Sequence, residues 1–206
     1  MKKTIPVTSL FTDIGGVLLT NGWDRKGRAA AAKHFRLDLE ELNERHHLTF
    51  DTYESGKLDL EEYLSRVVFY DKRSFTRKQF REFMFSRSEP FPEMIDMIRK
   101  IKEQYRIKIA VISNEGRELN AYRIKKFKLS EFVDFFISSC YVHFRKPDAD
   151  IFRVALDIAH VPAAKVVYLE DRSLFVHVAE GLGIRTIHHT DFKTTQKQLA
   201  ELGFKV

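Results

Sequence analysis

The chain has 206 residues, of which 44% are hydrophobic and 31% are charged. This composition excludes disordered and fibrous proteins, and the length suits one α/β domain with an insert or two small domains. The net charge is +6, but Lys and Arg are spread along the chain beside Asp and Glu, which favours a solvated surface over nucleic-acid binding.

The single cysteine, Cys140, excludes an internal disulfide, and no Cys/His cluster has the spacing of a zinc site. The apolar run near the start is too short for a signal peptide, since Asp13 interrupts the apolar residues that come after it. No segment approaches the roughly 18 apolar residues of a membrane span. We therefore expect a cytoplasmic protein that binds neither a membrane nor nucleic acid.

The first half of the chain begins with a strand pattern over residues 6–12 and then changes character. Four amphipathic patterns come next, which predict helices over residues 25–35, 38–49, 59–70 and 75–86. No convincing strand pattern interrupts them. Four helices in a row inside an α/β chain predict a helical subdomain over residues 22–86, inserted into a core formed by residues 1–21 and 87–206.

In the second half, strand and helix patterns alternate. Pro92 opens a helix that runs to about Tyr105. Further helices are expected to end near residues 126, 160, 181 and 202, and the strand patterns cover residues 107–112, 135–139, 166–169 and 184–188. This alternation predicts a doubly wound, Rossmann-like parallel sheet with right-handed crossovers.

Polar residues follow three of these strands, and a lysine precedes one of the helices: Asp13, the pairs Ser113-Asn114 and Glu170-Asp171, and Lys146. The carboxyl ends of parallel strands share one edge of a sheet, so these side chains should converge. Acidic oxygens suit Mg²⁺, and a lysine and a hydroxyl offset charge on phosphoryl oxygens. Backbone N–H groups of Ile14, Gly15 and Asn114 add donors. The set predicts a site for phosphoryl transfer.

Four short motifs carry this pattern: DIGGVL at 13–18, VISN at 111–114, RKP at 145–147, and YLEDR at 168–172 followed by AEGLGI. In this order, and each after the expected element, they resemble the motifs of the haloacid dehalogenase-like hydrolase superfamily. The predicted helical insert after the first motif is similar to the helical cap of that family, which closes over the site.

The resemblance implies a role for each motif. Asp13 would attack phosphorus and form an aspartyl-phosphate. Ser113, Asn114 and Lys146 would bind the phosphoryl group, together with the backbone at Ile14 and Gly15. Mg²⁺ would be held by Asp13, by Asp171, by the backbone carbonyl of Gly15, and by Glu170 directly or through water.

One position departs from the family pattern. Phosphatases of the family usually carry a second Asp two residues after the nucleophile, where it protonates the leaving oxygen, and this chain has Gly15 there. Losing such a group costs on the order of 10²–10⁴-fold in rate. Three alternatives stay open: a good leaving group such as an anomeric sugar phosphate, a substitute such as water or the cap residues Asp24, His46 or His47, or weak catalysis.

The function expected from the sequence is Mg²⁺-dependent hydrolysis of a small phosphorylated metabolite, for example a sugar phosphate, by a monomer or homodimer. One alternative is a haloacid dehalogenase, which needs neither the second acid nor a metal. The adjacent acids Glu170 and Asp171 argue against it, because they suit a cation. The other alternative is a catalytically weak protein that binds phosphate in a regulatory role.

Overall fold

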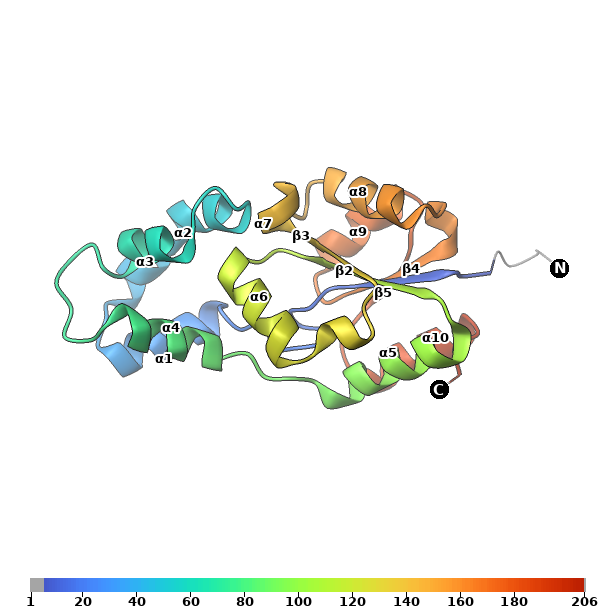
Figure 1. Cartoon of the computed structure of the whole chain (residues 1–206), viewed down its shortest axis with the longest axis horizontal. Coiled ribbons are helices and arrows are strands. Elements are labelled where there is room, and N and C mark those ends of the chain that lie inside the picture. Colours follow the sequence, from blue (N-terminus) through green and yellow to red (C-terminus); the bar gives the residue numbers. More distant parts are fainter. Residues whose placement is uncertain (1–5, 206) are drawn as a thin grey trace.

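A computed structural model of the chain describes residues 6–205 (Figure 1). Its strands are β1 (Ser9–Thr12), β2 (Lys108–Ser113), β3 (Phe135–Ser138), β4 (Val166–Glu170) and β5 (Arg185–His188). Its α-helices are α1 (Arg25–Phe35), α2 (Leu39–Glu54), α3 (Leu60–Val67), α4 (Arg77–Ser86), α5 (Pro92–Tyr105), α6 (Arg117–Lys126), α7 (Ser139–Val142), α8 (Asp150–Ala159), α9 (Ser173–Gly181) and α10 (Phe192–Glu201). Two short 3-10 helices are η1 (Leu129–Glu131) and η2 (Ala163–Lys165). Within the described residues, no helix is long and apolar enough to cross a membrane.

The five strands form one parallel sheet in the order β3-β2-β1-β4-β5, which confirms the predicted doubly wound architecture. β1 lies at the centre, where Thr12 is in register with Val111 of β2 and Leu169 of β4. Asp13 follows Thr12, so it lies in the middle of the carboxyl edge of the sheet. Strand order therefore decides which residue occupies the centre of the site.

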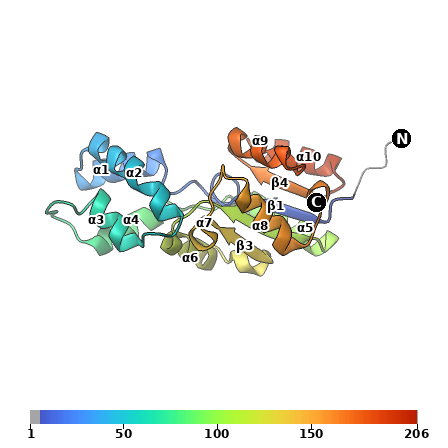
Figure 2. The same ribbon diagram turned by 90° about the horizontal axis from the view of Figure 1, so that it is seen from above.

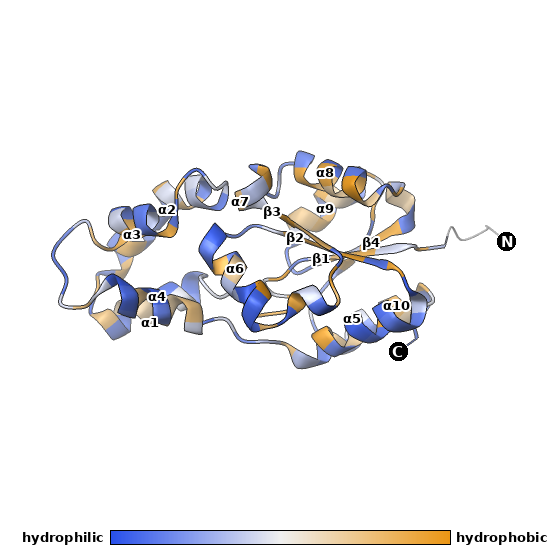
Figure 3. Cartoon of the chain, in the orientation of Figure 1, coloured by the Kyte–Doolittle hydropathy of each residue, from blue (hydrophilic) through white to orange (hydrophobic). Residues whose placement is uncertain are grey.

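Successive side chains of each strand point to opposite faces of the sheet, and both faces are buried. On β1, Leu10 packs in a cluster with residues of α5 and α10, whereas Phe11 packs with residues of α8 and α9. Figure 1 shows these two helix pairs on either side of the sheet. Figure 3 shows hydrophobic strands at the centre and mixed helices outside, as expected for a sheet that is covered twice.

Most predicted boundaries differ from the structure by a few residues, and α2 differs most. The predicted end at residue 49 is wrong, since the helix continues to Glu54. Thr49 is accommodated by a hydrogen bond from its hydroxyl to the carbonyl of Arg45 at 2.7 Å, and Tyr53 is buried in the last turn. The chain leaves the helix before Gly56, whose φ of +72° favours glycine. The short helix α7 was not predicted.

Helices α1 to α4 pack around their own apolar cluster, which includes Trp23, Tyr63 and Phe80 and is joined by Leu119 of α6. Figures 1 and 2 show these four helices together at one end of the molecule. This arrangement supports the proposal that residues 22–86 form a cap inserted into a discontinuous core.

The two connections between these helices and the sheet run side by side. The N–H of Thr20 donates to the carbonyl of Glu89 at 2.9 Å. Arg123 of α6 holds both connections, because its guanidinium donates to the Thr20 carbonyl at 2.8 Å and to the Ser88 hydroxyl at 3.0 Å. A Cβ atom at Gly22 would lie 2.1 Å from Nη2 of Arg123, and Gly22 has a φ of +65°. The connection therefore requires glycine at this point.

Candidate active site

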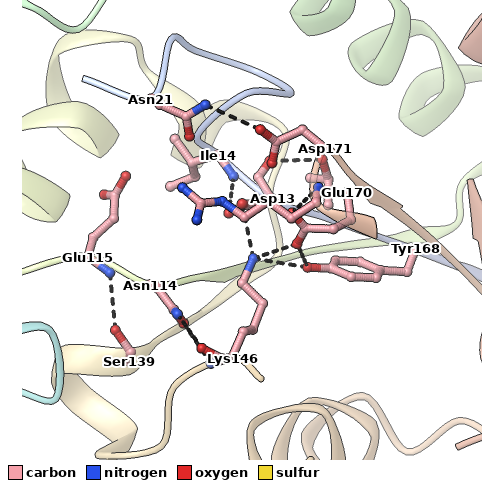
Figure 4. Close-up of polar contacts among 12 residues, drawn as sticks. Asp13, Ile14, Asn21, Asn114, Glu115, Ser139, Lys146, Tyr168, Glu170 and Asp171 are labelled. Carbon is pink, nitrogen blue, oxygen red and sulfur yellow. Dashed lines mark hydrogen bonds and ion pairs between the residues drawn. The ribbon is translucent and has the colours of Figure 1, made fainter. Parts of the chain in front are cut away.

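Asp13 is buried at the carboxyl end of β1, with 8% of its surface exposed. Its Oδ1 accepts a hydrogen bond from the N–H of Ile14 at 2.7 Å, and its Oδ2 lies 3.0 Å from Nζ of Lys146 (Figure 4). The structure thus brings together two predicted site residues that are far apart in the sequence. The backbone N–H of Ile14, a predicted phosphoryl donor, is used here by the carboxylate itself.

Lys146 is fully buried in the loop before α8, and both its side-chain amine and its backbone are hydrogen-bonded. Its Nζ donates to Oε2 of Glu170 at 2.7 Å and to the hydroxyl of Tyr168 at 3.0 Å. The amide of Asn114 donates to the Lys146 carbonyl at 2.7 Å and accepts from the Lys146 N–H at 2.8 Å. The side chain of Asn114 therefore positions the lysine, which leaves its backbone N–H for the predicted phosphoryl contact.

Charge at the site is unbalanced, because one lysine faces the carboxyl groups of Asp13, Glu170 and Asp171. Burial raises the pKa of Asp13 to about 7, with Lys146 opposing and Glu170 adding to the rise. Burial alone would raise the pKa of Glu170, but Lys146 outweighs it and lowers that pKa. Burial would likewise lower the pKa of Lys146, and its two acidic partners raise it. Added positive charge would therefore stabilise the ionised form of Asp13.

The carboxylates of this site fit a divalent cation. Oxygen atoms of Asp13, Glu170 and Asp171 lie within 4.8 Å of one another. Oδ1 of Asp171 is buried without a hydrogen-bond partner among residues 6–205, and its Oδ2 accepts from Asn21 at 3.2 Å. A Cβ atom at Gly16 would lie 2.1 Å from that Oδ2, so the glycine makes room for the carboxylate. Hard oxygen ligands of this kind are those of Mg²⁺.

The carboxylate oxygens of Glu170 have more hydrogen-bond partners than the sequence suggests. Its Oε2 accepts from Lys146 and from the Tyr168 hydroxyl, and its Oε1 accepts from the N–H of Arg172 at 3.1 Å. Both of its oxygens thus have protein partners, whereas Asp171 keeps one free. Glu170 is placed to hold Lys146, and its predicted contact with a metal, directly or through water, stays a prediction.

Ser113 and Gly15 complete the predicted phosphoryl contacts. The Ser113 hydroxyl is buried at the end of β2 and has no hydrogen-bond partner within the described part of the chain, so it is free to donate to an anion. Gly15 lines the cavity beside Asn21, whose Oδ1 would lie 2.8 Å from a Cβ atom at position 15. Asn21 therefore occupies space next to the position where a side chain at residue 15 would begin.

A cavity of about 540 Å³ opens between helices α1, α2 and α4 of the insert and the edge of the sheet. Asp13 and Lys146 line it from the sheet, and Arg28, His46 and Phe50 line it from the insert. This volume is in the range of pockets that bind small molecules. The site can therefore hold a small anionic compound against the Asp13 carboxylate.

Comparison with known proteins agrees with this geometry. Residues 31–189 match the haloacid dehalogenase-like hydrolase family. The chain belongs to this family. A flavin mononucleotide hydrolase of Arabidopsis thaliana is 25% identical over 173 residues, which make up 84% of this chain and 69% of the relative.

Two solved structures of bacterial family members have the same fold. An enzyme of Bacteroides thetaiotaomicron, in complex with magnesium and inorganic phosphate, has a TM-score of 0.74 at 20% identity and covers 88% of this chain and 93% of its own. A protein of Porphyromonas gingivalis, described as a predicted hydrolase of the same family, has a TM-score of 0.75 at 20% identity, over 95% of this chain and 98% of its own. The family match begins after Asp13, so the place of Asp13 in the site rests on the geometry above.

Three residues of the insert were candidates to replace the second aspartate of the family's phosphatases. His47 is exposed and lies outside the cavity lining. Asp24 lines the cavity, but its Oδ1 accepts from the N–H of Gly27 at 2.8 Å and caps α1. His46 also lines the cavity, but burial and nearby Arg28 lower its pKa to about 3. His46 is therefore neutral near pH 7 and poorly suited to donate a proton.

The depressed pKa of His46 makes the stability of the fold sensitive to acid. From its ordinary value of 6.5 the pKa falls to about 3 in the folded protein, so between these values only the unfolded chain takes up the proton. Stability from this residue is complete above pH 6.5 and falls as the pH decreases, by about 2 kcal/mol at pH 5. Urea unfolding should show that the free energy of unfolding falls less between pH 7 and pH 5 for His46→Asn than for the wild type. The exposed neighbour variant, His47→Asn, is the control, and an equal loss in all three proteins would contradict the assignment.

Sequence reasoning missed three contributors, Tyr168, Asn21 and Arg145. Arg145 stands beside Lys146 in the RKP motif and pairs with Glu54 at the end of α2 at 2.6 Å. It thereby ties the insert to the loop that carries Lys146. A charged neighbour of Lys146 was visible in the sequence, whereas nothing in the sequence indicated a role for Asn21 or Tyr168.

Proposed function

We propose that this protein is a Mg²⁺-dependent phosphatase that hydrolyses small phosphate monoesters, with Asp13 as the nucleophile. The observation that carries the proposal is the buried Asp13–Lys146 pair at 3.0 Å, next to the acidic cluster completed by Glu170 and Asp171. The magnesium and phosphate bound by the Bacteroides enzyme support it, as does the phosphate ester named for the Arabidopsis relative.

In the proposed reaction, a carboxylate oxygen of Asp13 attacks phosphorus and the bond from phosphorus to the ester oxygen breaks. The ester oxygen leaves with the electron pair and takes a proton from water. Water then attacks the aspartyl-phosphate, which releases inorganic phosphate and restores the carboxylate. Lys146 and the Ser113 hydroxyl stabilise negative charge on the phosphoryl oxygens. Mg²⁺, held by Asp13 and Asp171, would supply further neutralisation of that charge.

The leaving group decides how well this site works, because no side chain is present at Gly15 to protonate the departing oxygen. We propose that the preferred esters leave with little help, as an anomeric sugar phosphate does. A primary alkyl ester, such as a sugar 6-phosphate or flavin mononucleotide, is the demanding case. A steep dependence of rate on leaving-group acidity is expected from this arrangement.

A phosphate-release assay on sugar 1-phosphates, sugar 6-phosphates and flavin mononucleotide, with Mg²⁺ and with EDTA, tests the proposal. We expect turnover that EDTA abolishes and that is fastest for the sugar 1-phosphates. Turnover of a 2-haloacid that EDTA leaves unchanged would favour the dehalogenase alternative. Phosphate binding without turnover of any ester would favour a binding protein.

Introducing the missing acid should change the dependence on the leaving group. Gly15→Asp is expected to raise the rate for alkyl phosphates by up to about 10²-fold, since a positioned acid contributes that much. The gain requires the Asn21 side chain to move, because its Oδ1 would otherwise lie 2.8 Å from the new Cβ atom. Gly15→Asn has the same size without the acid and is the control. Equal rates for the two variants would show that another group already supplies the proton.

A further inference from the structure

We propose that Arg28 and His46 form a second subsite in the cavity, which binds an anionic oxygen group, carboxylate or phosphate, on the leaving part of the substrate. The inference rests on the proposed phosphatase function and adds the chemical class of the ester. It assigns the wall of the cavity opposite Asp13 to substrate selection.

Arg28 of α1 is a buried cation that forms no close ion pair among the described residues, and the carboxylates of Asp24 and Glu54 act on it only from a distance. Only 7% of its surface is exposed, and its guanidinium donates to two neutral oxygens, Oδ1 of Asn43 at 2.8 Å and the carbonyl of Trp23 at 3.1 Å. Among residues 6–205, no carboxylate forms an ion pair with it, and its Nη2 has no hydrogen-bond acceptor. A buried charge of this kind is costly unless an anion compensates it. Since Arg28 lines the cavity, a ligand can supply that anion.

His46 of α2 is fixed as a hydrogen-bond donor by a chain of two bonds. Nε1–H of Trp23 donates to the Tyr63 hydroxyl at 2.8 Å, and that hydroxyl lies 2.8 Å from Nδ1 of His46. Tyr63 is fully buried, so its own hydrogen must go to Nδ1, the acceptor that remains. The proton of the neutral imidazole is therefore on Nε2. His46 lines the cavity, so this N–H is available to a ligand.

The two donors are neighbours, because Asn43, whose side chain accepts from Nε of Arg28, lies one helical turn before His46 on α2. The charges of Arg28 and Arg145 both act on His46, and that of Arg145 is matched by Glu54. Within the described part of the chain, the polar atoms of Arg28 and His46 that have no partner are N–H groups. A carboxylate or phosphate satisfies two such donors with acceptor oxygens alone, and a charged guanidinium makes the stronger bond to an anion.

Matched substrates test this assignment. 3-Phosphoglycerate and glycerol 3-phosphate differ by a carboxylate in place of a hydroxymethyl group, and propane-1,3-diol bisphosphate and its monophosphate differ by a second phosphate. In each pair we expect wild-type kcat/KM to favour the more anionic compound, on the order of 10- to 100-fold. The pair with the larger ratio identifies the group that the subsite prefers.

Arg28→Gln should remove most of this preference, and Arg28→Lys should keep part of it because the charge remains. Tyr63→Phe frees Nδ1 of His46 and should reduce the preference by less than about 10-fold. Arg81→Gln, an exposed position on α4, is the control and should keep the wild-type ratio. Thermal melting of each variant separates loss of the subsite from loss of the fold.

Calorimetry can measure the affinity of the Asp13→Asn protein for the same compounds. The ratio of affinities within each matched pair then reports the preference of the subsite without turnover. If no ester is hydrolysed but the affinity ratio depends on Arg28, the proposed function fails and the anion subsite stands. If the esters are hydrolysed but neither the wild-type ratio nor the affinity favours the more anionic compounds, the subsite is wrong and the phosphatase stands. A preference unchanged in folded Arg28→Gln and Arg28→Lys would also overturn it.

Discussion

Replacing Asp13 by asparagine is expected to reduce turnover of phosphate monoesters by at least about 10⁴-fold, because a neutral amide does not attack phosphorus at a useful rate. The shape of the site should stay, since an amide oxygen can still accept from the N–H of Ile14, and Lys146 keeps its 2.7 Å contact with Glu170. The substitution therefore separates chemistry from folding.

Single-turnover phosphate release and thermal melting measure these two effects. Melting should be unchanged or slightly raised, because burial disfavours the ionised carboxylate, as the pKa of about 7 for Asp13 indicates. Asp134→Asn is a control away from the active site, where the carboxylate pairs with Lys102 and should affect stability but not turnover. A rate near that of the wild type in Asp13→Asn would remove Asp13 from the mechanism.

Replacing Lys146 by methionine is expected to abolish turnover and to lower the free energy of unfolding by about 3–5 kcal/mol. The lysine is fully buried between Asp13 at 3.0 Å and Glu170 at 2.7 Å, so its loss leaves two buried carboxyl groups without a cation. Their pKa values in the folded state would then rise above those in the unfolded chain. A carboxyl group with a raised folded pKa lowers the free energy of unfolding as the pH rises from its unfolded pKa to its folded pKa. The destabilisation caused by Lys146→Met should therefore be larger at pH 8 than at pH 5.

Urea unfolding at the two pH values measures this effect. Lys193→Met, at an exposed position of α10, is the matched control and should change stability by less than about 0.5 kcal/mol. A loss in Lys146→Met that does not grow with pH would show that the two carboxyl groups do not depend on the lysine as their contacts indicate.

The sequence alone determined the parallel sheet and the meeting of Asp13, Lys146, Glu170 and Asp171. The reason is that strands and helices leave local patterns of period 2 and 3.6, and parallel strands place their carboxyl ends at one edge. Residues that follow such strands are brought together by the architecture, however far apart they lie in the chain. The family resemblance rests on the same motifs, and the family match confirms it.

Only the tertiary structure decided what each side chain contacts. Glu170 is engaged by Lys146 and Tyr168, Asn21 fills the space beside Gly15, and the histidine proposed as an acid is a neutral donor. These contacts join segments as distant as Asn21 and Asp171, at atoms whose distances depend on how helices and loops pack. A pattern in the sequence specifies the face or edge on which a side chain lies. Burial and contacts with other side chains set the protonation state of a group and the atoms it can contact, and these arise only once the chain has folded.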